Sequence, residues 1–181
     1  MISVFVGTSL DGFIARRNGS FDFLDAGGGE PHGYDEFIAG IDAIVMGRNT
    51  YETVLNMKLE QWPYGKKHVV VLSHRTLDLS GSIAKGAVLE QMSGEPAEIV
   101  AQLAAKDCHN LYIDGGITVQ EFLRAGVVDR IIVSRVPVLI GEGIPLFGMV
   151  PKDITLEHVA TTQYKGGLVK SEYRVVKSSM Q

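Results

Sequence analysis

The sequence predicts an α/β fold in a single domain, residues 1–181, in which a mostly parallel central sheet is closed by an antiparallel C-terminal hairpin. Two apolar runs, Ala43 to Met46 and Asn110 to Asp114, each lead into glycine and then into a helical segment, as parallel strands do where they turn into helices. The last two predicted strands, Ile154 to Tyr164 and Leu168 to Val176, are joined by two glycines. The second of them alternates apolar and charged residues, which is typical of an antiparallel strand with one face exposed to solvent.

The N-terminal elements follow from composition and turn residues. Ile2 to Ser9 is rich in β-branched and aromatic residues and predicts a buried first strand, which Phe13 to Ala15 continues under the sheet edge. Asn18 to Pro31 contains Asn-Gly, three consecutive glycines and a proline, which predict a long flexible loop. Such a loop is either a functional lid or a disordered surface segment. Tyr34 to Ala39 has the apolar spacing of a short helix that ends at Gly40.

The second half of the chain supplies the remaining elements. Lys67 to Leu72 predicts a third strand, and Pro96 stands in the first turn of the next helix. Val127 to Ile140 is a long strand signal that Pro137 interrupts. Three shorter features complete the order: a polar turn at Thr76 to Gly86, a brief strand at Ala87 to Leu89 and a turn cluster at Gly141 to Pro145.

The composition argues against several classes of protein. With 17 basic and 21 acidic residues the net charge is −4, and the basic residues are scattered, unlike those of a nucleic-acid or membrane-surface protein. No apolar run approaches the roughly 18 residues of a membrane span, and the N-terminus lacks the cationic region of a signal peptide. Cys108 is the single cysteine, so we expect a reducing compartment, the cytoplasm. The five histidines lack ligand spacing, so we expect no metal site.

Each glycine corner predicts an anion site. The first N–H groups of a helix have no partner within the helix and the helix dipole is positive there, so a phosphate can bind at that end. Gly47 permits a close approach, Arg48 adds a guanidinium and Thr50 a hydroxyl donor. Gly115 and Gly116 repeat the pattern, and the carboxyl ends of parallel strands share one edge of a sheet. The alternative for a single corner is a tight turn with no ligand.

The third strand ends in two polar side chains and a guanidinium, those of Ser73, His74 and Arg75. This combination suits a phosphate monoester, such as the extra phosphate that separates NADP from NAD. Together, the three strand ends predict a site for a phosphorylated dinucleotide.

These motifs resemble the dihydrofolate reductase superfamily, and more closely the reductase domain at the C-terminus of bacterial riboflavin-biosynthesis deaminase/reductases. The matching stretches follow the family order along nearly the whole chain: Ser9 to Ala15, Val45 to Tyr51, Val71 to Ser73, Ile113 to Gly116, Val128 to Arg130, Pro137 to Gly141 and Gly143 to Phe147. The resemblance implies a dihydrofolate reductase-like three-layer fold, NADPH as the hydride donor and, since relatives commonly form dimers, a homodimer. We expect the apolar segments Ile131 to Ile140 and Ile144 to Phe147 to supply the dimer contact.

The resemblance also implies positions for the cofactor. Ser73 and Arg75, with His74 nearby, would bind the 2′-phosphate and the adenine end, and the backbones of Gly7 and Ile14 would line the nicotinamide pocket. Six residues at the two corners would bind phosphates: Gly47, Arg48, Thr50, Gly115, Gly116 and Thr118.

The substrate side departs from both families. Folate reductases carry an acid on the first helix, but the position four residues before Phe37 is Gly33, so Asp35 and Glu36 are candidate substitutes. Each could equally be an exposed first-turn acid favoured by the helix dipole. Asp114 could bind substrate hydroxyls or cap a helix, and Asp11 could face the pocket or form a turn. The segment between Tyr51 and Lys67 also lacks the Asp-Pro and arginine that bind the ribose phosphate in riboflavin reductases. The catalytic residue therefore stays open.

Three hypotheses follow for the function. The first is an NADPH-dependent reductase of the riboflavin-biosynthesis type, 5-amino-6-(5-phosphoribosylamino)uracil reductase-like, that acts on a small heterocyclic or ribosylamino substrate. The second is a dihydrofolate reductase. The third is an NADPH-binding protein without reductase activity. Hydride transfer is chemistry of the cofactor, and it needs orientation and exclusion of water more than a protein nucleophile.

Overall fold

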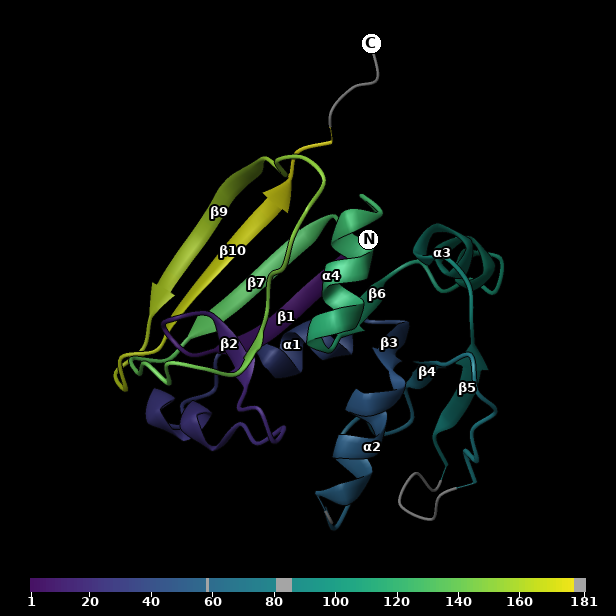
Figure 1. Cartoon of the computed structure of the whole chain (residues 1–181), viewed down its shortest axis with the longest axis horizontal. Coiled ribbons are helices and arrows are strands. Elements are labelled where there is room, and N and C mark those ends of the chain that lie inside the picture. The colour runs from purple at the N-terminus through teal and green to yellow at the C-terminus, as the bar shows by residue number, and fades with distance from the viewer. Residues whose placement is uncertain (58, 81–85, 178–181) are drawn as a thin grey trace.

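The computed structural model describes residues 1–57, 59–80 and 86–177 and is built around an eight-stranded sheet (Figure 1). The order across the sheet is β5-β4-β3-β6-β1-β7-β10-β9. Its strands have these bounds: β1 (Ile2–Thr8), β3 (Ala43–Gly47), β4 (His68–Leu72), β5 (Val88–Met92), β6 (Leu111–Asp114), β7 (Arg130–Arg135), β9 (Leu156–Gln163) and β10 (Val169–Val175).

The first six strands in that order pair in parallel, and β10 pairs antiparallel with both β7 and β9. Strands β1 and β3 lie inside the sheet, and Val4, Ile44 and Val45 have no exposed surface. Continuous apolar runs of this kind are expected where both faces of a parallel sheet are covered. The predicted fold class, a mostly parallel sheet with an antiparallel C-terminal hairpin, is confirmed.

Helices cover both faces of the sheet. Ile99 of α3 (Pro96–Ala104) and Phe122 of α4 (Gly116–Arg124) pack in one core cluster with Val4 and Val45. On the other face, Tyr51 of α2 (Arg48–Asn56) and residues of α1 (Tyr34–Ala39) pack with Phe5, Ile44 and Tyr112. Neighbouring residues of one strand thus pack into the two cores on opposite faces of the sheet, because successive side chains of a strand alternate between faces.

The structure corrects three sequence predictions. The loop predicted at Asn18 to Pro31 contains a 3-10 helix, η1 (Asp22–Gly27). The long strand predicted at Val127 to Ile140 is limited to β7, because Pro137 cannot donate a ladder hydrogen bond and the chain leaves the sheet there. The turn cluster at Gly141 to Pro145 contains β8 (Ile144–Pro145), which pairs with β2 (Phe13–Ala15) in a separate small sheet.

Two further predictions concern the chain around β5. This strand begins one residue after the start of the predicted brief strand and continues to Met92. Residues 81–85 of the predicted polar turn lie outside the described part of the chain. Among the described residues, no helix is long and apolar enough to cross a membrane.

Candidate functional site

The first glycine corner joins β3 directly to α2. Gly47 is the last residue of β3 and Arg48 the first of α2, and no side chain from the described residues caps this helix start. The first N–H groups of α2 are therefore available to an anion. Gly47 has an ordinary φ of −76°, but a Cβ atom there would lie 2.9 Å from Oγ1 of Thr118. Glycine is therefore favoured at position 47 by the lack of room for a side chain, not by the backbone conformation.

The second corner joins β6 to α4 through Gly115. This residue has a φ of 94°, which favours glycine, and a Cβ atom on it would overlap Oγ1 of Thr50. Thr50 of the first corner thus covers the glycine of the second, while Thr118 of the second covers Gly47. The two helix starts therefore approach each other closely, and each leaves backbone N–H groups that an anion can bind.

Arg48 is tied to its own helix. Its Nη1 atom lies 2.9 Å from Oε1 of Glu52, one turn further along α2. The Arg48 side chain is about one-third exposed, so the ion pair is weak and can rearrange when an anion binds.

The turn after β4 is fixed by hydrogen bonds that the sequence alone did not reveal. Oγ of Ser73 accepts from the Arg75 backbone N–H at 3.0 Å, and Gln91 of β5 donates to the carbonyls of Ser73 and Arg75 at 3.0 and 2.7 Å. His74 and the Arg75 side chain are exposed at this edge. Gln91 is a supporting residue that only the pairing of β4 with β5 brings into place.

A cavity of about 760 Å³ runs along the carboxyl edge of the parallel strands. It unites the two corners with the turn after β4. All the residues predicted to contact the cofactor line it: Gly7, Ile14, Gly47, Arg48, Thr50, Ser73, His74, Arg75, Gly115, Gly116 and Thr118. The structure thus brings these residues to one cavity, and their roles in binding stay predictions.

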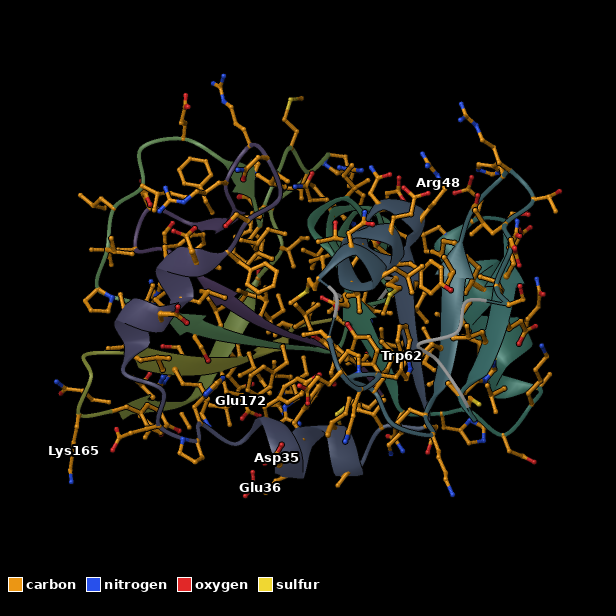
Figure 2. The ribbon with its side chains drawn as sticks, turned by 90° about the horizontal axis from the view of Figure 1, so that it is seen from below. Asp35, Glu36, Arg48, Trp62, Lys165 and Glu172 are labelled. Atoms are coloured by element: carbon orange, nitrogen blue, oxygen red, sulfur yellow. The ribbon has the colours of Figure 1, made fainter. Side chains whose placement is uncertain are left out.

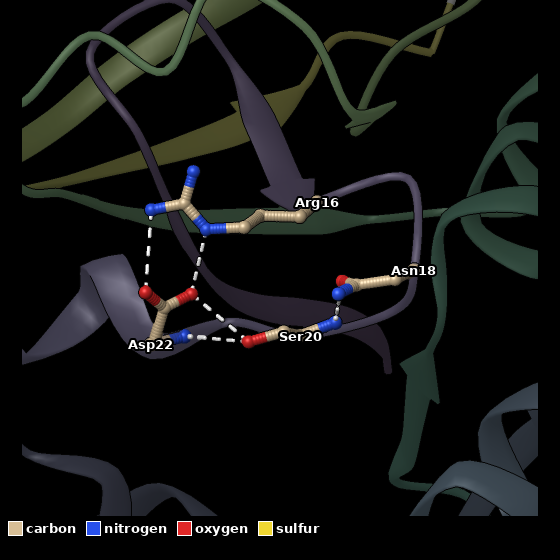
Figure 3. Close-up of polar contacts among 4 residues, drawn as sticks. All are labelled: Arg16, Asn18, Ser20 and Asp22. Carbon is tan, nitrogen blue, oxygen red and sulfur yellow. Dashed lines mark hydrogen bonds and ion pairs between the residues drawn. The ribbon is translucent and has the colours of Figure 1, made fainter.

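The loop predicted as flexible forms part of the cavity wall, through Gly19, Phe21 and Leu24. Figure 3 shows how its first half is held. Arg16 binds Asp22 through Nε at 2.7 Å and Nη2 at 3.3 Å, and Ser20 donates to the same carboxylate at 2.9 Å. These hydrogen bonds lower the pKa of Asp22, with that from Arg16 the largest cause.

The second half of the loop is held by the hairpin at the end of the sheet. Glu30 accepts a hydrogen bond from the backbone N–H of Lys165 at 2.8 Å. A Cβ atom on Gly28 would lie 2.8 Å from Cα of Gly166, so the two backbones are in close contact. The loop is thus attached at both ends, and its first half lines the main cavity.

Beyond the glycine corners, the cavity is walled by aromatic side chains. Phe5 and Tyr34 meet edge to face at 5.5 Å between ring centroids, and Tyr34 and Tyr112 do so at 6.3 Å. Tyr64 and Tyr112 are also buried. Burial raises the pKa of Tyr34 to about 12, so its phenol stays a hydrogen-bond donor at neutral pH.

Asp114 lies in this aromatic part of the cavity. The Tyr64 hydroxyl lies 3.2 Å from its Oδ2 atom, close enough to donate a hydrogen bond. Burial raises the pKa of the Asp114 carboxyl, against the lowering effect of the hydrogen bonds from Tyr64 and from the Gly115 backbone. Tyr64 also packs in a core cluster of the sheet. Its link to a residue 50 positions away could not be seen in a local pattern.

The other candidate acids lie elsewhere. Asp35 and Glu36 line a second cavity of about 330 Å³, and Figure 2 shows them together and well separated from Arg48. Both cavities share Leu24 and Tyr34, so they adjoin. Asp11 lines neither cavity, and its carboxylate accepts hydrogen bonds from the backbone N–H groups of Ile140 and Gly141. The structure therefore favours the turn-forming interpretation of Asp11.

The family model of the RibD C-terminal domain matches residues 1–170. The chain belongs to the RibD C-terminal domain family. This is a family of reductase type, so the match supports an oxidoreductase in general terms. The chain is 32% identical to the uncharacterized protein YwjB of Bacillus subtilis, over 94% of this chain and 95% of YwjB.

Solved structures of RibD-like and dihydrofolate reductase proteins share the fold. The structure of a proposed riboflavin biosynthesis protein from Shewanella sp. PV-4 has a TM-score of 0.89 and 32% identity, covering 97% of this chain and 99% of that one. Dihydrofolate reductase from Enterococcus faecalis, complexed with NADP(H), has a TM-score of 0.61 and 17% identity, covering 98% and 97%. The dihydrofolate reductase-like fold predicted from the motifs is therefore confirmed.

Proposed function

We propose that this RibD C-terminal domain protein is an NADPH-dependent reductase of a small heterocyclic or ribosylamino substrate. The observation that carries the proposal is the division of one cavity into two chemically different parts. The two glycine corners and the turn after β4 offer backbone N–H groups, hydroxyls and guanidinium groups at one end. The other end is aromatic, with Asp114 among phenols. An anionic dinucleotide suits the first part and a planar ring the second.

The residues present fit the cofactor. The corners would hold the diphosphate, and Ser73 with Arg75 would bind the 2′-phosphate. The cofactor supplies the hydride when bound. The chain orients the two reactants and excludes water, with Gly7 and Ile14 at the ring end and Phe21 and Leu24 covering the cavity.

Two alternative functions remain testable. A dihydrofolate reductase would oxidise NADPH with dihydrofolate and bind antifolates tightly. An NADPH-binding protein without reductase activity would bind the nucleotide but oxidise it with none of the candidate substrates. The missing first-helix acid at Gly33 favours neither a folate substrate nor tight antifolate binding.

The first experiment is a paired titration of NADPH and NADH on the wild type and on Arg75→Ala. We expect NADPH to bind more tightly by roughly 1 to 3 kcal/mol, the range of charge-assisted hydrogen bonds, and Arg75→Ala to remove most of that difference. Arg124→Ala is the control, because Arg124 is an exposed arginine outside the cavity. Equal affinities for both nucleotides in all three proteins would contradict the proposed 2′-phosphate site.

We also propose that the protein is a homodimer, but through β9. Of the two segments from which we expected the contact, Ile131 to Ile140 buries Ile131, Ile132 and Val133 but exposes Leu139, and Ile144 to Phe147 exposes Phe147, so that contact stays a prediction. By contrast, all eight residues of β9 are exposed, and β9 is the last strand of the sheet (Figure 1). It carries neither lysine nor proline, the residues that usually protect an edge strand. A second copy could extend the sheet by antiparallel pairing across a two-fold axis.

Solution mass tests the dimer. We expect the wild type to be dimeric and Val159→Lys, in the middle of β9, to be monomeric. Val88→Lys is the control, because Val88 is similarly exposed on β5 at the other end of the sheet. A monomeric wild type, or dimers in both variants, would refute pairing through β9. The cytoplasmic location and the lack of a metal site stay predictions.

A further inference from the structure

The second cavity continues the main cavity on the side of α1. Both cavities are lined by Leu24 and Tyr34, which form a shared wall. A Cβ atom on Gly7 would lie 3.0 Å from a methyl group of Leu24, so this wall stands over the end of β1. The second cavity encloses about 330 Å³. A ring bound among the phenols of the main cavity therefore has room for a substituent beyond Tyr34.

The two cavities differ in the charges that line them. The arginines of the main cavity are Arg48, at the first glycine corner, and Arg75, in the turn after β4. The second cavity is lined instead by three carboxylates, those of Glu30, Asp35 and Glu36. Among the described residues it is lined by no arginine or lysine. Because walls of one charge attract ligands of the other, the two ends favour ligands of opposite sign.

The three carboxylates have no cationic partner in the part of the chain that the structure describes. None of the ion pairs found there includes any of them. Lys170 does not line the cavity, and its ammonium group already donates a hydrogen bond to the His32 carbonyl at 2.8 Å. Figure 2 shows Lys165 well separated from Asp35 and Glu36. A cation that enters the second cavity would therefore meet carboxylates that no described lysine or arginine neutralises.

A buried hydroxyl without a partner lies at the junction of the two cavities. Ser134 of β7 is 1% exposed, and its Oγ atom has no hydrogen-bond partner among the described residues. It pairs with Lys170 on one side and with Gly7, over which Leu24 lies, on the other. Its side chain follows that of Ile132 by two positions, so it projects on the sheet face that α1 covers. A buried hydroxyl without a partner is costly, and a donor group of a ligand would satisfy it.

We propose that the second cavity binds a cationic substituent of the substrate, such as a primary ammonium group, and disfavours a phosphate ester. The proposal rests on the proposed reductase function and narrows its substrate class. Glu30, Asp35 and Glu36 would attract the charge, and Ser134 would accept a hydrogen bond from the ammonium group. A phosphate ester would bring a charge of roughly −2 beside the same three carboxylates, where like charges repel.

Binding of three matched probes to the protein saturated with NADP⁺ tests the proposal without turnover. Each probe is a 6-aminouracil whose exocyclic nitrogen carries a propyl chain, and the chain ends in an ammonium, a hydroxyl or a phosphate group. The ring and the chain are constant, so differences in affinity report the terminal group alone.

At low salt we expect the ammonium probe to bind about tenfold more tightly than the hydroxyl probe, and the phosphate probe about tenfold more weakly. Both differences should shrink to about threefold or less at an ionic strength of about 0.5 M, because salt screens charges on exposed side chains. Equal affinities for the three probes, or a preference for the phosphate probe, would overturn the proposal.

Substitutions at the exposed carboxylates make the test specific. The double variant Asp35→Asn, Glu36→Gln removes two charges and keeps the shapes of the side chains. We expect it to reduce the preference for the ammonium probe over the hydroxyl probe to about threefold or less, with hydroxyl-probe affinity unchanged. Asp25→Asn is the control, because Asp25 is an exposed acid of η1 that lines neither cavity. An unchanged preference in the double variant, or an equal loss in the control, would refute the proposal.

Ser134→Ala tests the buried hydroxyl. We expect the variant to bind the ammonium probe about threefold more weakly, while its free energy of unfolding stays the same or rises, because a buried group without a partner is removed. Unchanged affinity for the ammonium probe would refute the role assigned to Ser134. A wild type that does not bind NADP⁺ contradicts the proposed function, whereas NADP⁺ binding without a preference among the probes contradicts this inference alone.

Discussion

The hydroxyl of Thr50, in the first turn of α2, occupies the space that a side chain on Gly115 would need. The relationship is reciprocal, because Thr118 in the first turn of α4 lies over Gly47 in the same way. Two helices that follow different strands are therefore brought together at their N-termini, where an anion gains from both dipoles. The glycines permit this contact, and the threonines fix its geometry.

The first prediction concerns Gly115→Ala. We expect it to lower the free energy of unfolding by about 1 to 3 kcal/mol and to weaken NADPH binding, because it combines a positive φ with a clash against Thr50. Urea unfolding and NADPH titration measure the two effects. Gly126→Ala is the control, since Gly126 has a φ of 68° but open space around it. If both variants lose the same stability, the contact with Thr50 adds nothing.

Much of the cavity end formed by the glycine corners could be predicted because its signals are local. A strand that runs into glycine and then into a helix start is visible within ten residues of sequence, as around Gly47 and Gly115. The shared edge then follows from parallel pairing. The exchange of threonines between the corners could not be predicted, since it depends on the distance between the axes of α2 and α4. No periodicity encodes that distance.

The aromatic end of the cavity was less predictable for a physical reason. Asp114 was named as a candidate, but its environment comes from Tyr34, Tyr64 and Tyr112, which belong to separate parts of the chain. Their apolar rings look like ordinary core residues in a sequence. Similarly, η1 carries turn-forming glycines at its end, so its helical turn was hidden in a loop signal. Tertiary packing, not local propensity, decided both features.

The second prediction compares two buried phenols. Tyr51 has a buried hydroxyl with no partner among the described residues, whereas the Tyr112 hydroxyl donates to the Phe5 carbonyl at 3.0 Å. We expect Tyr51→Phe to leave the free energy of unfolding unchanged or to raise it by up to about 1 kcal/mol. Tyr112→Phe should lower it by roughly 1 kcal/mol. Urea unfolding of both variants measures this, and the reverse order would contradict the assigned hydrogen bonds.

The third prediction concerns the loop over the cavity. Asp22→Asn removes the charge that binds Arg16 and should loosen the segment that carries Gly19, Phe21 and Leu24 (Figure 3). We expect faster cleavage by trypsin after Arg16 or Arg17 and faster NADPH dissociation, with little change in global stability. Glu142→Gln is matched to it, because it removes the exposed partner of Arg17 at 3.0 Å. Equal cleavage of both variants would show that the Arg16 contact does not hold the loop.

The last prediction concerns how Asp114 makes stability depend on pH. Its pKa is raised in the folded protein, so the folded state keeps the proton to higher pH than the unfolded state does. The favourable contribution is complete below the ordinary pKa of 3.8 and is lost as the pH rises through the folded value. Asp114→Asn cannot ionise. Its free energy of unfolding relative to the wild type should therefore increase with pH, by roughly 1.4 kcal/mol for each unit of pKa shift. Urea unfolding of both proteins between about pH 4 and 8 measures the difference, in which the titration of the other carboxylates cancels. A difference that stays constant across this range would mean that burial does not raise the pKa of Asp114.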